Sequence, residues 1–413
     1  MQGNKLDVKK TLLLSFGFFA SSIAWSVYNS FVPQILAGFI TSTTLIGFIM
    51  TFDNIFGVVF QPLFGKLSDK THTRFGRRMP YIFIGLPICA AAFTMIPKMG
   101  SLGSLMTVII IFTFVMSAWR SPVVALMPDI TPGPLRSQAN GIVNLLGGVG
   151  SLIAFFAGGI LFKAGGFPLP FLMSSVMMLL ALAVLALFVR EPKHAYEPEE
   201  KNKNADIKQL SREEKKSLLL ILLGVFFWFT GYNAVETFFT LYATNTLDMD
   251  AGSASMTLAI FSLTFLAFAV PAGFIAVKTG RRRAILIGLT GLVVLFLPMV
   301  FLANVWIARI CLFLGGFFWA MVNINSLPMV VQLSGEEKVG AFVGYYYFFS
   351  FSSQIVSPVL FGFIRDLVGH YKVLFLYASI AFVLAAICLF FVRHGEDAPV
   401  SVSASEVFES LDD

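Results

Sequence analysis

Two carboxylic acids lie deep within apolar stretches of this sequence. Asp53 stands about ten residues into one hydrophobic run, and Glu236 lies inside another run in the second half of the chain. An ionisable side chain at bilayer depth costs roughly 2.5–3.5 kcal/mol on insertion scales, so it usually faces a cavity or a partner. A carboxylate exposed in turn to the two sides of a membrane could bind a proton on one side and release it on the other. Asp53 and Glu236 are therefore candidate proton-coupling residues.

Each acid also has a second interpretation. Asp53 could form a permanent ion pair with Arg120, which lies in another apolar run. Glu236 comes one helical turn after Tyr232, so the two side chains could share a face. There it could accept hydroxyl groups of a ligand, or it could lie close enough to water to stay solvated.

The composition indicates a membrane protein. The 413 residues are 57% hydrophobic and only 13% charged, whereas soluble domains carry about 25% charged residues. The net charge of +6 comes from basic residues in short loops, so we expect no nucleic-acid partner. No phosphate-cradling glycine loop, metal-ligand cluster or nucleophile–base arrangement is evident, and we expect no enzyme activity, no cofactor and no metal.

Twelve apolar segments are each long enough to cross a hydrocarbon core of about 30 Å. Their approximate limits are 11–37, 43–65, 80–97, 103–128, 139–162, 169–189, 217–244, 254–277, 284–303, 304–331, 339–364 and 373–392. With the amino terminus in the cytoplasm, 23 Lys and Arg residues fall on the inner side and four on the outer side. The positive-inside rule then places both termini in the cytoplasm. We expect the protein in the plasma membrane, which is the inner membrane in a bacterium that has two.

One long polar segment divides the spans into six and six. We expect an amino-terminal six-helix bundle at 1–189, a cytoplasmic linker at 190–216, a carboxy-terminal six-helix bundle at 217–394 and a disordered acidic tail at 395–413. Near the end of the linker, Ser211-x-x-Glu214 predicts a capping box, and a short surface helix is expected at 211–216.

The two halves repeat weakly. Trp119 and Pro128 fall 200 residues before Trp319 and Pro328, and Gly280 to Arg283 matches the basic loop that ends at Arg78. These matches predict an all-α membrane protein with twelve transmembrane helices in two pseudo-symmetric six-helix bundles. In transporters of that layout the substrate binds midway, between the halves.

The loop after the second span resembles a known signature. Gln61–Asp69, with Gln-Pro-x-x-Gly-x-x-Ser-Asp, and Arg74–Arg78, with Arg-Phe-Gly-Arg-Arg, are similar to the loop between the second and third helices of the major facilitator superfamily. Together with Arg136–Asn140, they look most like the plant sucrose–proton symporters and their bacterial relatives. The resemblance implies a major facilitator fold, alternating access and cation-coupled uptake of a glycoside.

The chain departs from these families at their acidic positions. The sucrose symporters carry an acid where Thr113 stands here, and melibiose permease carries two where Gly57 and Gln61 stand. Asp53 lies one helical turn before Gly57, so its role cannot be copied from either relative.

The resemblance also implies a charge network that latches a cytoplasmic gate. Basic topology anchoring alone would explain its arginines but not its two aspartates. The candidate gate and structural residues are Gly65, Asp69, Arg74, Gly76, Arg77, Arg78, Asp129 and Arg136.

Sugars need polar partners together with an aromatic face, and several spans offer both. The candidate substrate-binding residues are Trp25, Tyr28, Asn29, Asn54, Trp119, Arg120, Asn144, Tyr232, Asn233, Asn323, Tyr346 and Gln354. Each could instead serve in packing or as a polar contact between helices.

The leading hypothesis is a monomeric secondary transporter that imports a sugar or glycoside together with protons, and the family resemblance implies that the cargo is a disaccharide. Sodium is the alternative coupling ion. Two other functions stay open: a proton-coupled exporter of drugs or small metabolites on the same scaffold, and a membrane receptor that does not transport.

Overall fold

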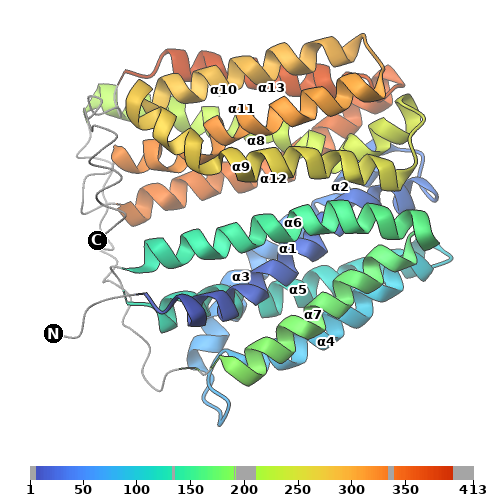
Figure 1. Ribbon diagram of the computed structural model, residues 1–413, viewed down its shortest axis with the longest axis vertical. Coiled ribbons are helices and arrows are strands. Elements are labelled where there is room, and N and C mark those ends of the chain that lie inside the picture. The colour runs from blue at the N-terminus through green and yellow to red at the C-terminus, as the bar shows by residue number, and fades with distance from the viewer. Residues whose placement is uncertain (1–5, 133–134, 190, 192–210, 334–338, 394–413) are drawn as a thin grey trace.

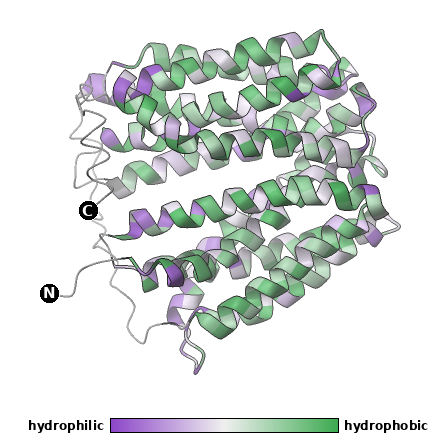
Figure 2. Cartoon of the chain, in the orientation of Figure 1, coloured by the Kyte–Doolittle hydropathy of each residue, from purple (hydrophilic) through white to green (hydrophobic). Residues whose placement is uncertain are grey.

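The computed structural model describes residues 6–132, 135–189, 191, 211–333 and 339–393. Within these residues, twelve spans are long and apolar enough to cross a membrane, as the sequence predicts. The predicted tail at 395–413 lies outside the described residues, as does the predicted linker apart from Glu191 and 211–216. Figure 2 shows hydrophobic residues along the lengths of the helices and hydrophilic residues gathered at their ends.

The first six spans comprise seven α-helices and a 3₁₀ turn. They are α1 (Val8–Ala37), α2 (Thr43–Met50) with α3 (Phe52–Lys70), α4 (Met79–Met95) with η1 (Ile96–Lys98), α5 (Leu102–Ile130), α6 (Arg136–Gly165) and α7 (Pro168–Phe188). The last six are α8 (Arg212–Thr246), α9 (Ala251–Thr279), α10 (Arg281–Phe296) with η4 (Leu297–Val300), α11 (Val305–Gln332), α12 (Val339–Val368) and α13 (Val373–Phe390).

The helices form two groups that lie side by side. In Figure 1, α1 and α3 to α7 occupy the lower part of the view, α8 to α13 occupy the upper part, and α2 lies next to α12. The groups contact one another mainly through the pairs α6–α9, α2–α12 and α1–α8. We call the end where α1 begins and α13 ends the basic end, because Arg77, Arg78 and Arg281–Arg283 lie there, and the opposite end the far end.

Local capping signals fix several helix ends. Ser211 and Glu214 form the predicted capping box, which confirms that prediction. The residues after Ser211 are the first turn of α8 itself, so the separate surface helix predicted at 211–216 is wrong. The side chain of Asn304 accepts from the backbone nitrogens of Trp306 and Ile307 and so begins α11, which separates the ninth span from the tenth.

The second span is broken in its middle. The apolar run 43–65 gives no sign of an interruption, yet α2 ends at Met50 and α3 starts at Phe52. Between them the Thr51 hydroxyl donates to the Phe48 carbonyl at 2.7 Å. The break places Asp53 in the first turn of α3, where the unpaired backbone N–H groups of a helix favour a negative charge.

Candidate transport site and gate

Asp53 is held by its neighbour and attracted by a cation. Its Oδ1 accepts from the Asn54 backbone nitrogen at 2.6 Å and from Asn54 Nδ2 at 2.8 Å. The charge of Arg120, on α5, acts on the Asp53 carboxylate. Within the described ranges, however, no nitrogen–oxygen distance of 4.0 Å or less joins the two side chains. The pair is thus electrostatically coupled without being a contact ion pair in this conformation.

Two polar atoms near Asp53 are buried without a hydrogen-bond partner. They are Tyr28 OH and Arg120 Nε, which belong to groups that interact electrostatically with the Asp53 carboxylate. Trp25 Nε1, next to Tyr28, is also unpartnered, whereas the unpartnered Trp119 lies on the other side of α5, against Gly85 of α4. The rings of Trp25 and Tyr28 meet edge to face with centroids 5.6 Å apart. The charge of Asp53 acts on the Tyr28 hydroxyl. Buried donors in folded proteins are nearly always satisfied, so a group of unsatisfied donors beside a carboxylate indicates a site for water or a polar ligand.

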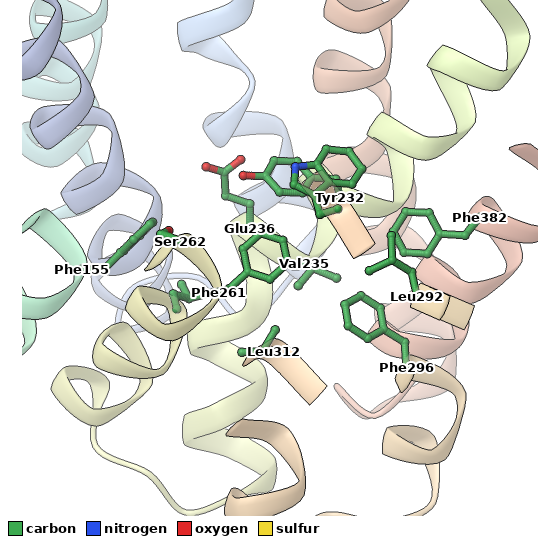
Figure 3. Close-up of a pocket in the computed structure, with 12 residues that line it drawn as sticks. Phe155, Tyr232, Val235, Glu236, Phe261, Ser262, Leu292, Phe296, Leu312 and Phe382 are labelled. Atoms are coloured by element: carbon green, nitrogen blue, oxygen red, sulfur yellow. The ribbon is translucent and has the colours of Figure 1, made fainter. Parts of the chain in front are cut away.

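The second acid lies in a cavity formed mainly by the other helix group. The volume of the cavity, counted as space for the centre of a water molecule, is about 30 Å³. Tyr232 stacks on Trp319 with ring centroids 4.4 Å apart and planes at 4°. Figure 3 shows the Tyr232 hydroxyl pointing toward the Glu236 carboxylate. The lining residues are Phe155, Tyr232, Val235, Glu236, Leu258, Phe261, Ser262, Leu292, Phe296, Leu312, Trp319 and Phe382.

The two acids belong to one region between the helix groups. Asn29, on α1, is the polar neighbour of Glu236, on α8. The charges of Glu236 and Asp53 also act on one another. Residues from α1, α3, α5 and α8 therefore meet at mid-span with two carboxylates, one guanidinium and an amide.

Other predicted binding residues have partners of their own or lie elsewhere. Asn233 donates to Ser353 Oγ at 3.3 Å in a buried contact between α8 and α12. The Tyr346 hydroxyl meets Ser326 Oγ at 2.9 Å. Asn144 is exposed, and neither it nor Asn323 or Gln354 lines the Glu236 cavity.

Sequence reasoning missed most of the residues that line this cavity, and two of them show why. Phe155 extends from α6 in the first helix group, and Ser262 extends from α9 in the second. A lone Ser or Phe in an apolar run carries no signal that distinguishes lining from packing.

The candidate gate residues at the basic end form a charge network within the first helix group. Arg77 Nη2 lies 2.8 Å from Asp129 Oδ1, and Arg78 Nε lies 3.0 Å from Asp129 Oδ2. Arg78 also pairs with Asp69 and donates to the Gly65 carbonyl at 3.2 Å. The network joins the ends of α3 and α5 to the loop before α4.

Glu191 is a member of this network that the sequence did not reveal. Its carboxylate accepts from the Arg78 backbone nitrogen at 3.0 and 3.1 Å. Burial raises the pKa of Glu191, while the backbone N–H groups of Arg78 and Arg77 oppose that change. Gly76 has φ of +104°, and a Cβ there would lie 1.8 Å from Glu191 Oε2. Only glycine fits that turn against the carboxylate.

Two further predicted gate residues make contacts of other kinds. Arg136 donates to the carbonyls of Thr131 and Pro128, both at 3.3 Å, at the end of α5. Arg74 lies over the ring of Phe75 at 4.7 Å.

Asp129→Ala is expected to lower thermal stability much more than Asp69→Ala. The Asp129 side chain is 11% exposed and binds two guanidinium groups, and breaking a buried pair costs about 3–5 kcal/mol. The Asp69 side chain is 55% exposed, and surface pairs contribute about 0–1 kcal/mol. Thermal unfolding of both variants in detergent measures the difference. Equal losses in Tm would contradict the ranking.

A twelve-span bundle in which acids, amides and aromatic rings converge at mid-span is a membrane transporter. The chain belongs to the Major Facilitator Superfamily, whose family model matches residues 14–258 and 242–411. The predicted superfamily is thus confirmed. The sucrose-symporter branch within it stays a prediction.

The relatives differ in what their names say they carry. The chain is 25% identical over 381 residues to the tetracycline resistance protein, class H, of Pasteurella multocida, covering 87% of this chain and 90% of that one. It is 23% identical over 301 residues to the isoprimeverose transporter of Lactiplantibacillus pentosus, covering 66% of this chain and 61% of that one. The solved nucleoside transporter NupG superposes with a TM-score of 0.73 at 13% identity, covering 93% and 100%. The last similarity concerns the fold alone.

Proposed function

We propose that this transporter imports a sugar or glycoside together with protons by alternating access. The observation that carries the proposal is the set of buried, unpartnered donors near Asp53, on Tyr28 and Arg120, with that of Trp25 next to Tyr28. A ligand rich in hydroxyl groups would satisfy such donors, whereas an apolar ligand would leave them unpaired at a cost of about 1–3 kcal/mol each. The similarity to the isoprimeverose transporter supports the same class of cargo.

Each central residue receives a role in this proposal. Asp53 takes up the coupling proton, because it lies at mid-span and no contact ion pair with Arg120 holds it permanently charged. Glu236 and Asn29 bind hydroxyl groups, and the stacked rings of Tyr232 and Trp319 provide a flat apolar face for the ligand.

The proposal includes a membrane orientation and two moving units. The basic end of the transporter faces the cytoplasm. The protein works as a monomer in the plasma membrane. Residues 1–189 and 217–394 rock against one another, and the network of Asp69, Arg77, Arg78 and Asp129 latches the basic end in part of the cycle.

Export of a lipophilic compound is the second candidate, and one observation favours it. Apart from Tyr232, Glu236 and Ser262, the Glu236 cavity is lined by apolar or aromatic side chains. The tetracycline resistance relative is consistent with that chemistry.

Uptake into proteoliposomes discriminates the two candidates. Purified protein is expected to accumulate at least one member of a disaccharide panel when an inward proton gradient is imposed, and a protonophore is expected to abolish the accumulation. Repeating the assay with an inward sodium gradient and no proton gradient identifies the coupling ion. Failure with every sugar, together with proton-driven accumulation of tetracycline in the opposite direction, would overturn import in favour of export.

A further inference from the structure

An aspartate of one helix group caps a helix of the other at the far end. Asp366 lies near the end of α12, and its carboxylate accepts four hydrogen bonds from the start of α2. Oδ1 accepts from the Thr43 backbone nitrogen at 2.8 Å. Oδ2 accepts from Ser42 Oγ at 2.8 Å, from the Thr44 backbone nitrogen at 2.9 Å and from Thr44 Oγ at 2.8 Å. Residues more than 320 positions apart in the chain are thereby joined.

This contact supplies what the amino terminus of α2 lacks. The first backbone N–H groups of a helix have no partner within it, and the helix dipole favours a negative charge there. Ser42 is the N-cap of α2 and satisfies only the Leu45 nitrogen, at 3.3 Å. The Asp366 carboxylate binds the N–H groups of Thr43 and Thr44. Charge-assisted hydrogen bonds of this kind are about twice as strong as neutral ones.

Groups beside Asp366 reinforce the junction. Arg365 Nη1 lies 3.3 Å from Asp366 Oδ1 and its guanidinium lies over the ring of Tyr371. The Tyr371 hydroxyl meets Thr43 Oγ1 at 3.3 Å in a buried contact. The α2 terminus is therefore bound by both ends of the α12–α13 connection.

Glycines bring the two backbones together along the same seam. A Cβ on Gly362 would lie 2.4 Å from the Thr43 carbonyl oxygen, and a Cβ on Gly47 would lie 2.2 Å from the Pro358 carbonyl oxygen. Contacts between a Cβ and a backbone atom below 3.0 Å force the helices to separate, because backbone cannot turn aside. The backbones of α2 and α12 are therefore in direct contact along this seam at the far end, independently of the Asp366 hydrogen bonds.

We propose that Asp366 and the amino terminus of α2 form a latch that holds the far end closed. The far end opens when the Asp366 carboxylate leaves the Ser42, Thr43 and Thr44 donors and water takes its place. The latch requires a transporter that alternates between two conformations, which the superfamily provides, and does not depend on the cargo or the coupling ion.

Spin-label distances across the far end test the latch without any substrate. Labels are attached at Gly100→Cys in the η1–α5 loop and at Ala303→Cys in the η4–α11 loop, both exposed positions on different helix groups. Cys89, Cys311 and Cys388 are replaced by Ser. In the full-length protein in nanodiscs, Asp366→Asn is expected to lower the ratio of short to long distances by at least about tenfold. Gly362→Ala is expected to shift the distribution in the same direction.

The control is Ser101→Ala. Ser101 caps α5 at the same end, but its side chain bonds Ser104 of that same helix and, within the described residues, no residue of the other helix group, so its loss is expected to leave the distances unchanged. A parent-like distribution in Asp366→Asn would overturn the latch, even if Gly362→Ala opened the seam. So would an equal shift in Ser101→Ala. If Asp366→Asn does not fold, Thr44→Val removes one donor to Asp366 and is judged by the same two outcomes, with a smaller shift.

Discussion

Asp53→Asn is expected to abolish uphill accumulation of the cargo while leaving counterflow exchange intact. Asn has nearly the same shape and can still accept from the Asn54 groups that now bind Asp53 Oδ1, so the site should fold. It cannot take up a proton, and a permanently neutral side chain uncouples substrate movement from the proton gradient. Gradient-driven uptake and substrate exchange, measured on the same proteoliposomes, separate the two activities.

The matched control is the same chemical change at Asp248. This exposed loop residue has φ of +53°, a conformation that Asn adopts as readily as Asp. Asp248→Asn should transport like the parent protein. Uphill uptake retained in Asp53→Asn would transfer the coupling role to another group. Loss of exchange as well as accumulation would instead show that Asp53 is needed for binding or folding.

Local patterns were enough to predict the helices, and the family resemblance marked residues that form the charge network at the basic end. The twelve spans follow from the length of apolar runs, and the Ser211–Glu214 box follows from capping chemistry that acts over one helical turn. The ion pairs of Asp129 with Arg77 and Arg78 join residues that the loop signature and the end of the fourth span had already marked. Each of these features is encoded within a short stretch or at neighbouring helix ends.

Long-range pairings could not be predicted in the same way. Glu191 meets Arg78 across 113 residues and Asp366 meets Thr44 across 322. A single Glu after a span or a single Asp near a helix end is common on solvated surfaces, so neither stood out. The break at Thr51 also lacked a sequence signal, since neither Gly nor Pro adjoins it. That break determines the first-turn position of Asp53.

Glu236→Gln is expected to raise the KM for the cargo by about tenfold to a hundredfold, as the loss of one charged hydrogen bond worth ~1.5–3 kcal/mol predicts. Glu236 has the Tyr232 hydroxyl and the Asn29 amide as its polar neighbours, and it lines the central cavity (Figure 3). Those surroundings suit a group that holds cargo hydroxyls. The pH dependence of transport should stay as in the parent, because the coupling proton is assigned to Asp53. Initial uptake rates across substrate concentration and pH provide both readouts.

Two further variants sharpen this assignment. Glu213→Gln makes the same change on the same helix at an exposed position in the first turn of α8, and it should leave KM unaltered. Tyr232→Phe removes the hydroxyl beside Glu236 but keeps the ring stacked on Trp319, so KM should rise in the same direction by a smaller factor. A flattened pH profile with unchanged KM in Glu236→Gln would contradict the binding role. It would make Glu236 a coupling group, and Asp53 and Glu236, whose charges act on one another, would then share the proton between the two helix groups.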